Sequence, residues 1–259
     1  MKRQSYILAT PVYQDTLQGS ELMRLAITIY NNPDVDHIFF CPEDLNTEKL
    51  KNSFPNSFFL RFSNHYFDSI NTYSELMLTS SFYRNFIEYE YLIISQLDSI
   101  ITRKLSYDLF SNYDYVGAAW MNPLTAFSIG NRLFLNSRKY SFVPNRSFSV
   151  GNGGLSIRKT KSLIEITKRI QNPILKFFGL GTNKGLNEDV IISYFASKYG
   201  YAIPNKAIAS RIFIEQYRQD PFDAWSVYGY HALEKYDPVL EKFIFEKYVS
   251  LGLTNHNKD

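Results

Sequence analysis

Short apolar runs recur along the first part of the chain, and a segment with helical spacing separates the first two. The runs at 6–10 (YILAT), 37–41 (HIFFC) and 91–95 (YLIIS) have the length and composition of buried strands. Residues 21–30 carry apolar side chains three and four positions apart, which is typical of an amphipathic helix. Strands that alternate with helices at this cadence predict an α/β fold with a mostly parallel central sheet flanked by helices.

The rest of the chain continues this pattern after an interruption. Residues 121–147 show neither strand nor helix periodicity and are rich in Asn, Ser, Arg and Pro, which predicts a long irregular segment such as a lid or a binding loop. No internal repeat or low-complexity linker divides the 259 residues, so we expect a single domain. Further strands are predicted at 57–62, 114–120, 148–160 and 201–205, and helices at 73–89, 161–170, 188–200 and 237–248.

Composition and missing motifs count against several classes of function. A single cysteine, Cys41, rules out an intrachain disulfide and a cysteine-rich metal site. The formal net charge is only +3, and no basic block is interleaved with aromatic residues, so nucleic acid is not an expected partner. There is no Walker loop, GxSxG or HExxH motif, and no GxGxxG opens a helix after the first strand. Kinases, serine hydrolases, zinc proteases and dinucleotide dehydrogenases therefore lose their main support.

Two segments bear on where the protein acts. The N-terminal apolar run is too short for a signal peptide, and no later segment reaches the length of a membrane span, so we expect a cytoplasmic protein. The helix predicted at 237–248 carries Phe243, Phe245 and Tyr248 among lysines. It either contacts the inner membrane at its periphery or packs its apolar side on the domain.

A single carboxylate, Asp98, follows the strand predicted at 91–95. Ligands of parallel sheets collect at the carboxyl ends of strands, where a carboxylate can bind Mg²⁺ or Mn²⁺ together with phosphate oxygens and water. Gln96 points to the same side as Asp98, because side chains of a strand alternate with a period of two. The alternative is that Asp98 only forms a turn as the strand leaves the core.

Three further stretches carry groups that suit a binding or catalytic site. The sequence GNGG (151–154) either forms a tight turn or lays its backbone close against a ligand. Glu188 and Asp189 open a predicted helix, where acids favour the helix dipole, but Asp189 is also suited to act as a general base on a hydroxyl. His231 is either a hydrogen-bonded core residue or a ligand to a metal such as manganese.

Taken in order, the stretches YLIISQLDSII, YDYVGAAW, SVGNGGLSIRKT, NEDVIISYF and YGYHAL resemble the DUF5672 group of bacterial and fungal proteins, which are treated as glycosyltransferases of the GT-A type. The similarity runs from about Tyr73 to about Leu233. It implies a GT-A-like, Rossmann-like single domain. In that domain 1–120 would form the nucleotide-sugar-binding half, 148–236 the acceptor and catalytic half, and 237–259 a C-terminal helix and tail.

The resemblance also implies roles for individual residues. QLD stands in place of the Asp-x-Asp motif that binds a nucleotide sugar through Mn²⁺ or Mg²⁺, with Asp98 at the last acid and His231 as a further ligand. Gln96 at the place of the first acid should weaken metal binding, so a metal-independent variant stays open. Glu188 and Asp189 resemble the catalytic Glu-Asp pair of inverting enzymes, in which the Asp is the base. Donor contacts are implied for Thr10, Pro11, Tyr13, Tyr73, Gln96 and Asp98, and sugar or acceptor contacts for Trp120, Asn152, Gly153 and Gly154.

The implied activity is transfer of a sugar from a nucleoside diphosphate donor, with a UDP-sugar as the first candidate, to a glycan or lipid-linked glycan. Bacterial surface polysaccharide assembly, of O-antigen or capsule, is the expected setting. Three alternatives stay open. These are a retaining transferase on the same fold, a non-catalytic protein that binds a nucleotide or a sugar, and a nucleotidyltransferase.

Overall fold

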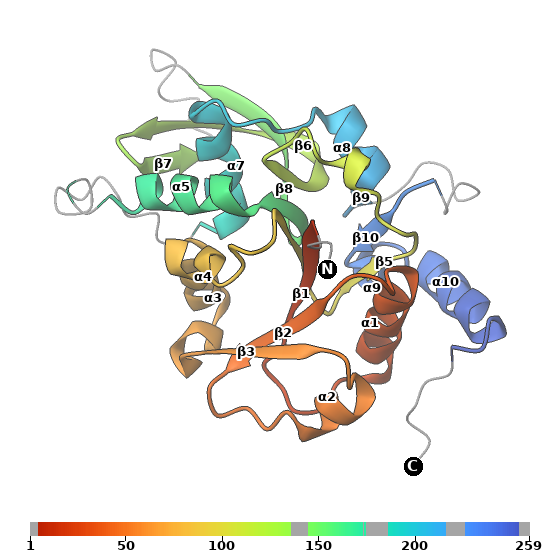
Figure 1. Ribbon diagram of the computed structural model, residues 1–259. Helices are drawn as coiled ribbons and strands as arrows, with labels where there is room; N and C mark the ends of the chain where they lie inside the picture. Colours follow the sequence, from red (N-terminus) through yellow and green to blue (C-terminus); the bar gives the residue numbers. More distant parts are fainter. Residues whose placement is uncertain (1–4, 136–144, 173, 175–185, 216–225, 254–259) are drawn as a thin grey trace.

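The computed structural model describes residues 5–135, 145–172, 174, 186–215 and 226–253. In these residues ten strands form one mixed sheet in the order β3-β2-β1-β4-β8-β6-β9-β10-β5, and β7 pairs with β6 (Figure 1). Of the nine strand pairings described, five are parallel. The strands are β1 (Tyr6–Pro11), β2 (His37–Pro42), β3 (Phe58–Phe62), β4 (Tyr91–Ser95), β5 (Ser99–Ile101), β6 (Tyr115–Ile129), β7 (Arg132–Leu135), β8 (Arg146–Lys159), β9 (Phe213–Ile214) and β10 (Gly229–His231).

Helices cover both faces of this sheet. The helices α3, α4, α5 and α7 lie on one side, and α1, α9 and α10 lie on the other (Figure 1). The helices are α1 (Gly19–Asn31), α2 (Glu48–Ser53), α3 (Ile70–Met77), α4 (Ser80–Arg84), α5 (Thr160–Ile170), α7 (Glu188–Lys198), α8 (Lys206–Ile212), α9 (Leu233–Tyr236) and α10 (Pro238–Ser250), with 3-10 turns η1 (Asn64–Phe67) and η2 (Tyr107–Leu109). The predicted α/β class with helices on a mostly parallel sheet is confirmed.

The strands predicted from apolar runs are central because both of their faces are buried. In β4, Leu92 and Ile94 pack with the cluster under α3, α5 and α7, whereas Ile93 packs with the cluster on the opposite face. The strands β3, β2, β1 and β4 are all parallel, as the alternation of strands and helices predicts. Parallel strands buried on two faces show continuous apolar runs, which explains why the sequence locates them well.

The irregular segment predicted at 121–147 is wrong for the residues that the structure describes. Strand β6 continues to Ile129 and forms an antiparallel hairpin with β7. Gly130 and Asn131 make the turn, with Gly130 in the left-handed conformation at a φ of 57°. Phe127 stacks on Phe134 across the hairpin, with ring centroids 5.0 Å apart. A Gly-Asn pair between two strands is a recognised hairpin signal, so the sequence did contain a sign of this turn. Residues 136–144 of the predicted irregular segment lie outside the described residues.

The strand predicted at 201–205 is also wrong. This segment forms no ladder but is anchored to Asp114, whose amide donates to the Ala202 carbonyl at 2.7 Å and whose Oδ2 accepts from the Ala202 amide at 2.8 Å. Asn205 then caps α8 by accepting from the amide of Ile208. The extended sequence therefore serves as a connection rather than as a strand.

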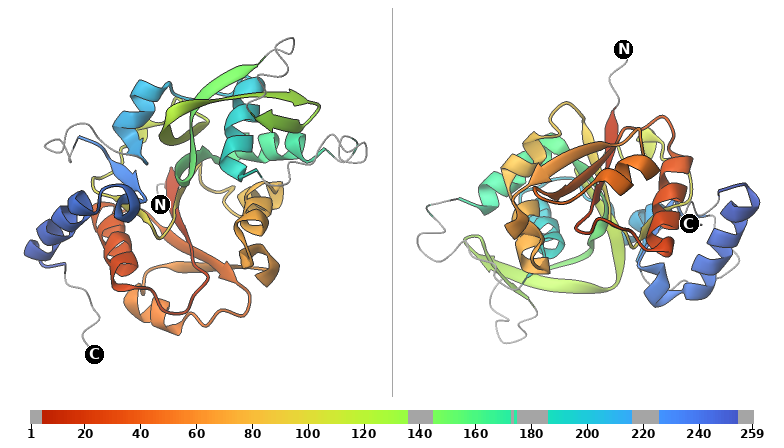
Figure 2. Two further views of the ribbon diagram at one scale, coloured as in Figure 1. Left: turned by 180° about the vertical axis from the view of Figure 1, so that it is seen from behind. Right: turned by 90° about the horizontal axis from the view of Figure 1, so that it is seen from below.

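The first and last helices lie side by side in all the views (Figures 1 and 2). Ile244 and Tyr248 of α10 pack with Ile27 of α1, and Tyr248 donates a hydrogen bond to the Thr102 carbonyl at 2.9 Å. The apolar side of α10 thus packs on the domain, while Phe243 remains half exposed. Within the described part of the chain, no helix is both long and apolar enough to cross a bilayer.

Candidate active site

A pocket of about 1200 Å³ opens where the carboxyl ends of β1 and β4 meet the glycine-rich stretch of β8. The N-terminal ends of α1 and α7 complete its wall together with α9. One predicted site residue is missing from it. The buried hydroxyl of Thr10 lies 3.0 Å from Nε2 of His37, so its side chain does not reach the pocket. The predicted residues that line the pocket are Pro11, Tyr13, Tyr73, Gln96, Asp98, Trp120, Asn152, Gly153, Gly154, Glu188, Asp189 and His231.

The GNGG stretch lies in β8 where its register with β6 shifts. Asn152 holds this irregularity, because its Oδ1 accepts from the amides of Gly154 at 2.9 Å and Leu155 at 3.3 Å. A Cβ on Gly154 would lie 2.2 Å from Nε2 of His231 and 2.6 Å from Oε1 of Gln96. Glycine at this position therefore makes room for the side chains of His231 and Gln96.

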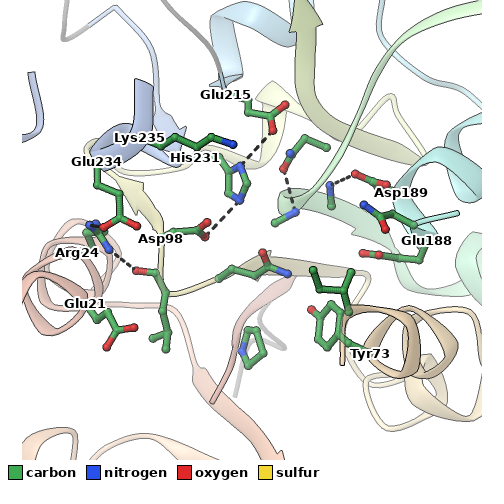
Figure 3. Close-up of a pocket in the computed structure, with 18 of the residues that line it drawn as sticks. Glu21, Arg24, Tyr73, Asp98, Glu188, Asp189, Glu215, His231, Glu234 and Lys235 are labelled. Carbon is green, nitrogen blue, oxygen red and sulfur yellow. Dashed lines mark hydrogen bonds and ion pairs between the residues drawn. The ribbon is translucent and has the colours of Figure 1, made fainter. Parts of the chain in front are cut away.

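The predicted acid pair opens α7 at one end of the pocket (Figure 3). Asp189 accepts hydrogen bonds from the amides of Gly153 at 3.2 Å and Val190 at 2.7 Å. Burial and the neighbouring Glu188 raise the pKa of Asp189 to about 7. Asp189 thus titrates near neutral pH, the range in which a general base works best.

Glu188 forms an ion pair with Arg158, which is fully buried. The guanidinium lies 3.4 Å from Oε1 of Glu188 and donates to the Gly153 carbonyl at 3.1 Å and to the Tyr83 hydroxyl at 2.8 Å. Ser74 donates to Oε2 of Glu188 at 3.1 Å. Arg158 and Ser74 therefore bind both carboxylate oxygens of Glu188, so Glu188 anchors the start of α7. Asp189, the next residue, lines the pocket.

His231 lies between two carboxylates at the other end of the pocket (Figure 3). Its Nε2 is 3.2 Å from Oδ1 of Asp98, and its Nδ1 is 3.7 Å from Oε1 of Glu215. Burial alone lowers the pKa of His231, but the two carboxylates outweigh it and raise the pKa to about 9. Burial opposes ionisation of Asp98, but contact with His231 keeps its pKa below the usual value.

The turn that carries Asp98 is fixed on three sides. The backbone N–H of Gln96 donates to the Gly154 carbonyl at 2.8 Å, and the backbone N–H of Ala232 donates to the Asp98 carbonyl at 2.9 Å. Buried Arg24 donates to the Leu97 carbonyl at 3.1 Å. Arg24 is held by Glu241 at 2.7 Å and by Glu234, so α9 and α10 support the turn through one side chain.

The sequence analysis missed Glu215, Arg24, Glu21, Glu234 and Lys235, all of which line the pocket. Arg24 carried a signal, since a basic residue inside the apolar stripe of a predicted helix must find partners when buried. Glu215 carried none. It follows the two-residue strand β9, whose existence depends on pairing with β10 and β6 far away in the sequence.

The family model described as "Protein of unknown function (DUF5672)" matches residues 57–231, more than half of the chain. The chain belongs to the DUF5672 family. This DUF5672 protein also resembles solved structures of LgtC. A structure of an LgtC active-site mutant shares 13% identity at a TM-score of 0.53, covering 94% of this chain and 95% of that chain. The galactosyltransferase LgtC with donor and acceptor sugar analogues shares 12% at 0.51, covering 93% and 95%.

These likenesses establish that the DUF5672 protein has a GT-A-like fold. No curated protein matched the chain. The predicted family and fold are confirmed, whereas the roles assigned to individual residues stay predictions.

GT-A-like glycosyltransferases commonly use a divalent metal. No group of three or more His, Cys, Asp or Glu side chains in the described residues has the arrangement of a metal site. Asp98 and His231 come nearest to one. Oδ1 of Asp98 and Nε2 of His231 make no hydrogen bond and lie 3.2 Å apart as an ion pair. Adjacent ligands of an octahedral cation bound at about 2.1 Å are separated by roughly 3 Å, so these two residues would hold Mg²⁺ or Mn²⁺ if the imidazole gave up its proton and oxygens of a bound donor completed the shell.

Proposed function

We propose that this DUF5672 protein is a glycosyltransferase that moves a sugar from a nucleoside diphosphate to a hydroxyl of a carbohydrate acceptor. One observation carries the proposal. A single pocket joins the Asp98–His231 pair to Asp189, a carboxyl with a pKa of about 7, and the glycines of β8 lie between them. The GT-A-like fold supports the same reaction class.

The charge of the pocket supports a donor that enters with a cation. Among the described residues, six carboxylates line the pocket, against two side chains with a permanent positive charge, Arg24 and Lys235. Because like charges repel strongly at partly buried sites, a diphosphate alone would be disfavoured here. A divalent cation at Asp98 and His231 would neutralise the charge of the leaving diphosphate. The fold family thus supports Mn²⁺ or Mg²⁺ as the cofactor despite Gln96.

The two halves of the donor would contact different residues of the pocket. Tyr13 is 61% exposed beside Pro11 at the end of β1 and offers an aromatic face to a nucleobase such as uracil. Asn152 and Gly153 line the pocket together with Asp189, where the transferred sugar would bind. In this proposal residues 1–120 bind the nucleotide and residues 148–236 bind the sugar and the acceptor.

Asp189 is the proposed general base. Its two amide partners fix the carboxylate, and Glu188 is kept from competing for the acceptor proton by Arg158 and Ser74. A base that accepts the proton of the acceptor hydroxyl while that oxygen attacks the sugar gives inversion in one displacement. The hydrogen bond to Gly153 also suits a carboxylate that only orients the donor sugar, as in a retaining enzyme. The anomeric configuration of the product separates the two.

The acceptor would enter along the apolar edge of the pocket. Apolar side chains that line the pocket are Phe67, Ile70, Trp120, Leu124 and Val190. Such a rim suits the apolar face of a sugar ring. A glycan or lipid-linked glycan of a bacterial surface polysaccharide, such as O-antigen or capsule, is the proposed acceptor, and the half-exposed Phe243 of α10 is a candidate for peripheral membrane contact.

A screen of nucleotide sugars tests the function. A matching donor is expected to raise the melting temperature in the presence of MnCl₂, because a ligand that binds only the folded state stabilises it by mass action. The same donors are then incubated with the protein, and release of nucleoside diphosphate is measured with and without glycan acceptors. Slow hydrolysis without acceptor and faster release with acceptor are expected. Stabilisation with no release under any condition would instead identify a non-catalytic binding protein.

A further inference from the structure

Glu215 lies on the side of His231 that faces away from Asp98 (Figure 3). Its Oε1 is 3.7 Å from Nδ1 of His231, and its side chain is only 14% exposed. Within the described part of the chain, Oε2 of Glu215 has no hydrogen-bond partner. Lone carboxylates are costly to bury, so the position of Glu215 beside an imidazole requires a reason.

Strand pairing places Glu215 beside His231. Strands β9 and β10 are parallel neighbours in the sheet, with Tyr230 opposite Ile214. Continuing this register by one residue brings Glu215 opposite His231, and residues opposite one another on adjacent strands point to the same face of the sheet. Asp98 comes from the turn before β5, where its carbonyl accepts from the Ala232 amide at 2.9 Å. The backbone therefore fixes the pairing of Glu215 with His231, and Asp98 reaches the imidazole from its other side.

We propose that Glu215 is a positioning residue that orients His231 toward a divalent cation shared with Asp98. This inference rests on the proposed function. Glu215 would accept the proton of Nδ1, which leaves the lone pair of Nε2 directed at the side where Oδ1 of Asp98 lies 3.2 Å away. A histidine that binds a metal through one ring nitrogen commonly donates from the other to a carboxylate, which fixes the tautomer and the ring orientation.

Gly154 supports this direction of the imidazole. A Cβ at this position would lie 2.2 Å from Nε2 and 2.7 Å from Cδ2 of His231, so the lack of a side chain at residue 154 leaves room for this edge of the ring. Oε1 of Gln96 borders the same space, 2.6 Å from that Cβ position. The Nε2 edge therefore faces the polar part of the pocket, whereas Nδ1 faces Glu215.

A competing explanation is that Glu215 only neutralises a charged imidazole in the folded protein. Removal of Glu215 would then alter the stability of the fold but leave metal affinity unchanged. Direct measurement of Mn²⁺ affinity separates the two roles, since the orientation of a ligand changes affinity without any need for catalysis.

The test is a titration of Mn²⁺ followed by the electron paramagnetic resonance signal of the free ion, with the metal alone and with UDP added. Glu215→Gln is expected to bind Mn²⁺ about 10- to 100-fold more weakly than the wild type, the usual effect of losing such a partner. Glu215→Asp, which keeps the carboxylate, should recover part of the loss. Glu21→Gln is the matched control, since it removes the same charge from the same pocket but contacts Gln14 and the Gln18 amide instead of His231.

Equal affinities for Glu215→Gln and Glu21→Gln would overturn the inference and leave the proposed transferase intact. Wild-type protein that binds no Mn²⁺, with or without UDP, would overturn it as well, and the donor-release assay in EDTA would then decide the transferase separately. A specific loss in Glu215→Gln supports the inference even where no donor is turned over. Circular dichroism verifies that each variant is folded. If Glu215→Gln does not fold, the Mn²⁺ affinity of Glu215→Asp is compared with that of Glu21→Gln instead.

Discussion

The two ends of the pocket differ in how their polar groups are satisfied. At the Asp189 end, both oxygens of Glu188 are bound by Arg158 and Ser74, and Asp189 accepts two backbone amides. At the Asp98 end, Oδ1 of Asp98 and both ring nitrogens of His231 make no hydrogen bond and are held only by the ion pairs of His231 with Asp98 and Glu215. A buried polar group that makes no hydrogen bond is less well satisfied than one that does. In our proposal the Asp189 end is therefore preorganised for chemistry, whereas the Asp98 end would receive a ligand.

We expect the largest effect on the rate of transfer from substitution of Asp189. Asp189→Asn removes the base and keeps the shape, so kcat for transfer should fall about 100- to 10,000-fold. Glu188→Gln should lose much less, because Glu188 acts through Arg158 and does not touch the acceptor in our account. Rates of nucleoside diphosphate release for the two variants measure the contrast, and equal losses would dissolve the distinction between the two acids.

Replacement of the buried arginine Arg158 tests how much its ion pair with Glu188 stabilises the Asp189 end of the pocket. Arg158→Met leaves Glu188 buried without its charge partner, and the free energy of unfolding should drop by about 3–5 kcal/mol. Adding Glu188→Gln should restore part of that loss. Urea denaturation provides the measurement, with Arg84→Met on the exposed side of α4 as a control expected within about 0.5 kcal/mol of the wild type. A loss below about 1 kcal/mol for Arg158→Met would show that the ion pair contributes little.

The pH dependence of transfer sharpens the comparison. Burial and Glu188 raise the pKa of Asp189 to about 7, and a general base acts only in its ionised form. Below pH 7, kcat/KM should therefore fall about tenfold per pH unit, and above it the rate should level off. The measurement is a pH–rate profile at fixed MnCl₂. A rate that stays constant from pH 5 to 7 would be inconsistent with Asp189 as the base.

The smallest effect concerns Thr10, the predicted donor contact that lies outside the pocket. Its hydroxyl meets His37, whose pKa burial lowers to about 3, so the ring is neutral and the contact is an ordinary hydrogen bond. Thr10→Val should cost about 1 kcal/mol of stability and change the donor KM less than about twofold. Thermal denaturation and donor kinetics check both values. A large rise in KM with unchanged stability would return Thr10 to the donor site.

Part of this site could be predicted from the sequence for a simple physical reason. Asp98 and Asp189 stand at the ends of elements that the sequence predicts, so their position relative to the sheet follows from local signals. His231 ends the three-residue strand β10, which no apolar pattern predicts, and only its residue type and the family resemblance marked it. GNGG could be recognised as unusual, but only the structure shows that Gly154 makes room for His231 and Gln96.

The remainder depends on contacts between distant parts of the chain. Glu215 reaches His231 because the two-residue strand β9 pairs with β10, and Arg24 reaches the Asp98 turn because α10 packs beside α1. No local pattern encodes such pairings. The hairpin formed by the end of β6 and β7 does carry a local signal, the turn dipeptide Gly130-Asn131. The sequence analysis missed it because the surrounding segment is rich in polar residues and shows no clear strand periodicity.

One measurement tests the central claim most directly: the anomeric configuration of the product, followed by ¹H NMR during transfer from a donor of known configuration. The account predicts that wild-type protein forms a new glycosidic bond of opposite configuration to the donor. Asp189→Asn should form the same product at a rate at least about 100-fold lower. A product that retains the donor configuration, or near-normal turnover by Asp189→Asn, would contradict the assignment of Asp189 as the base of an inverting transferase.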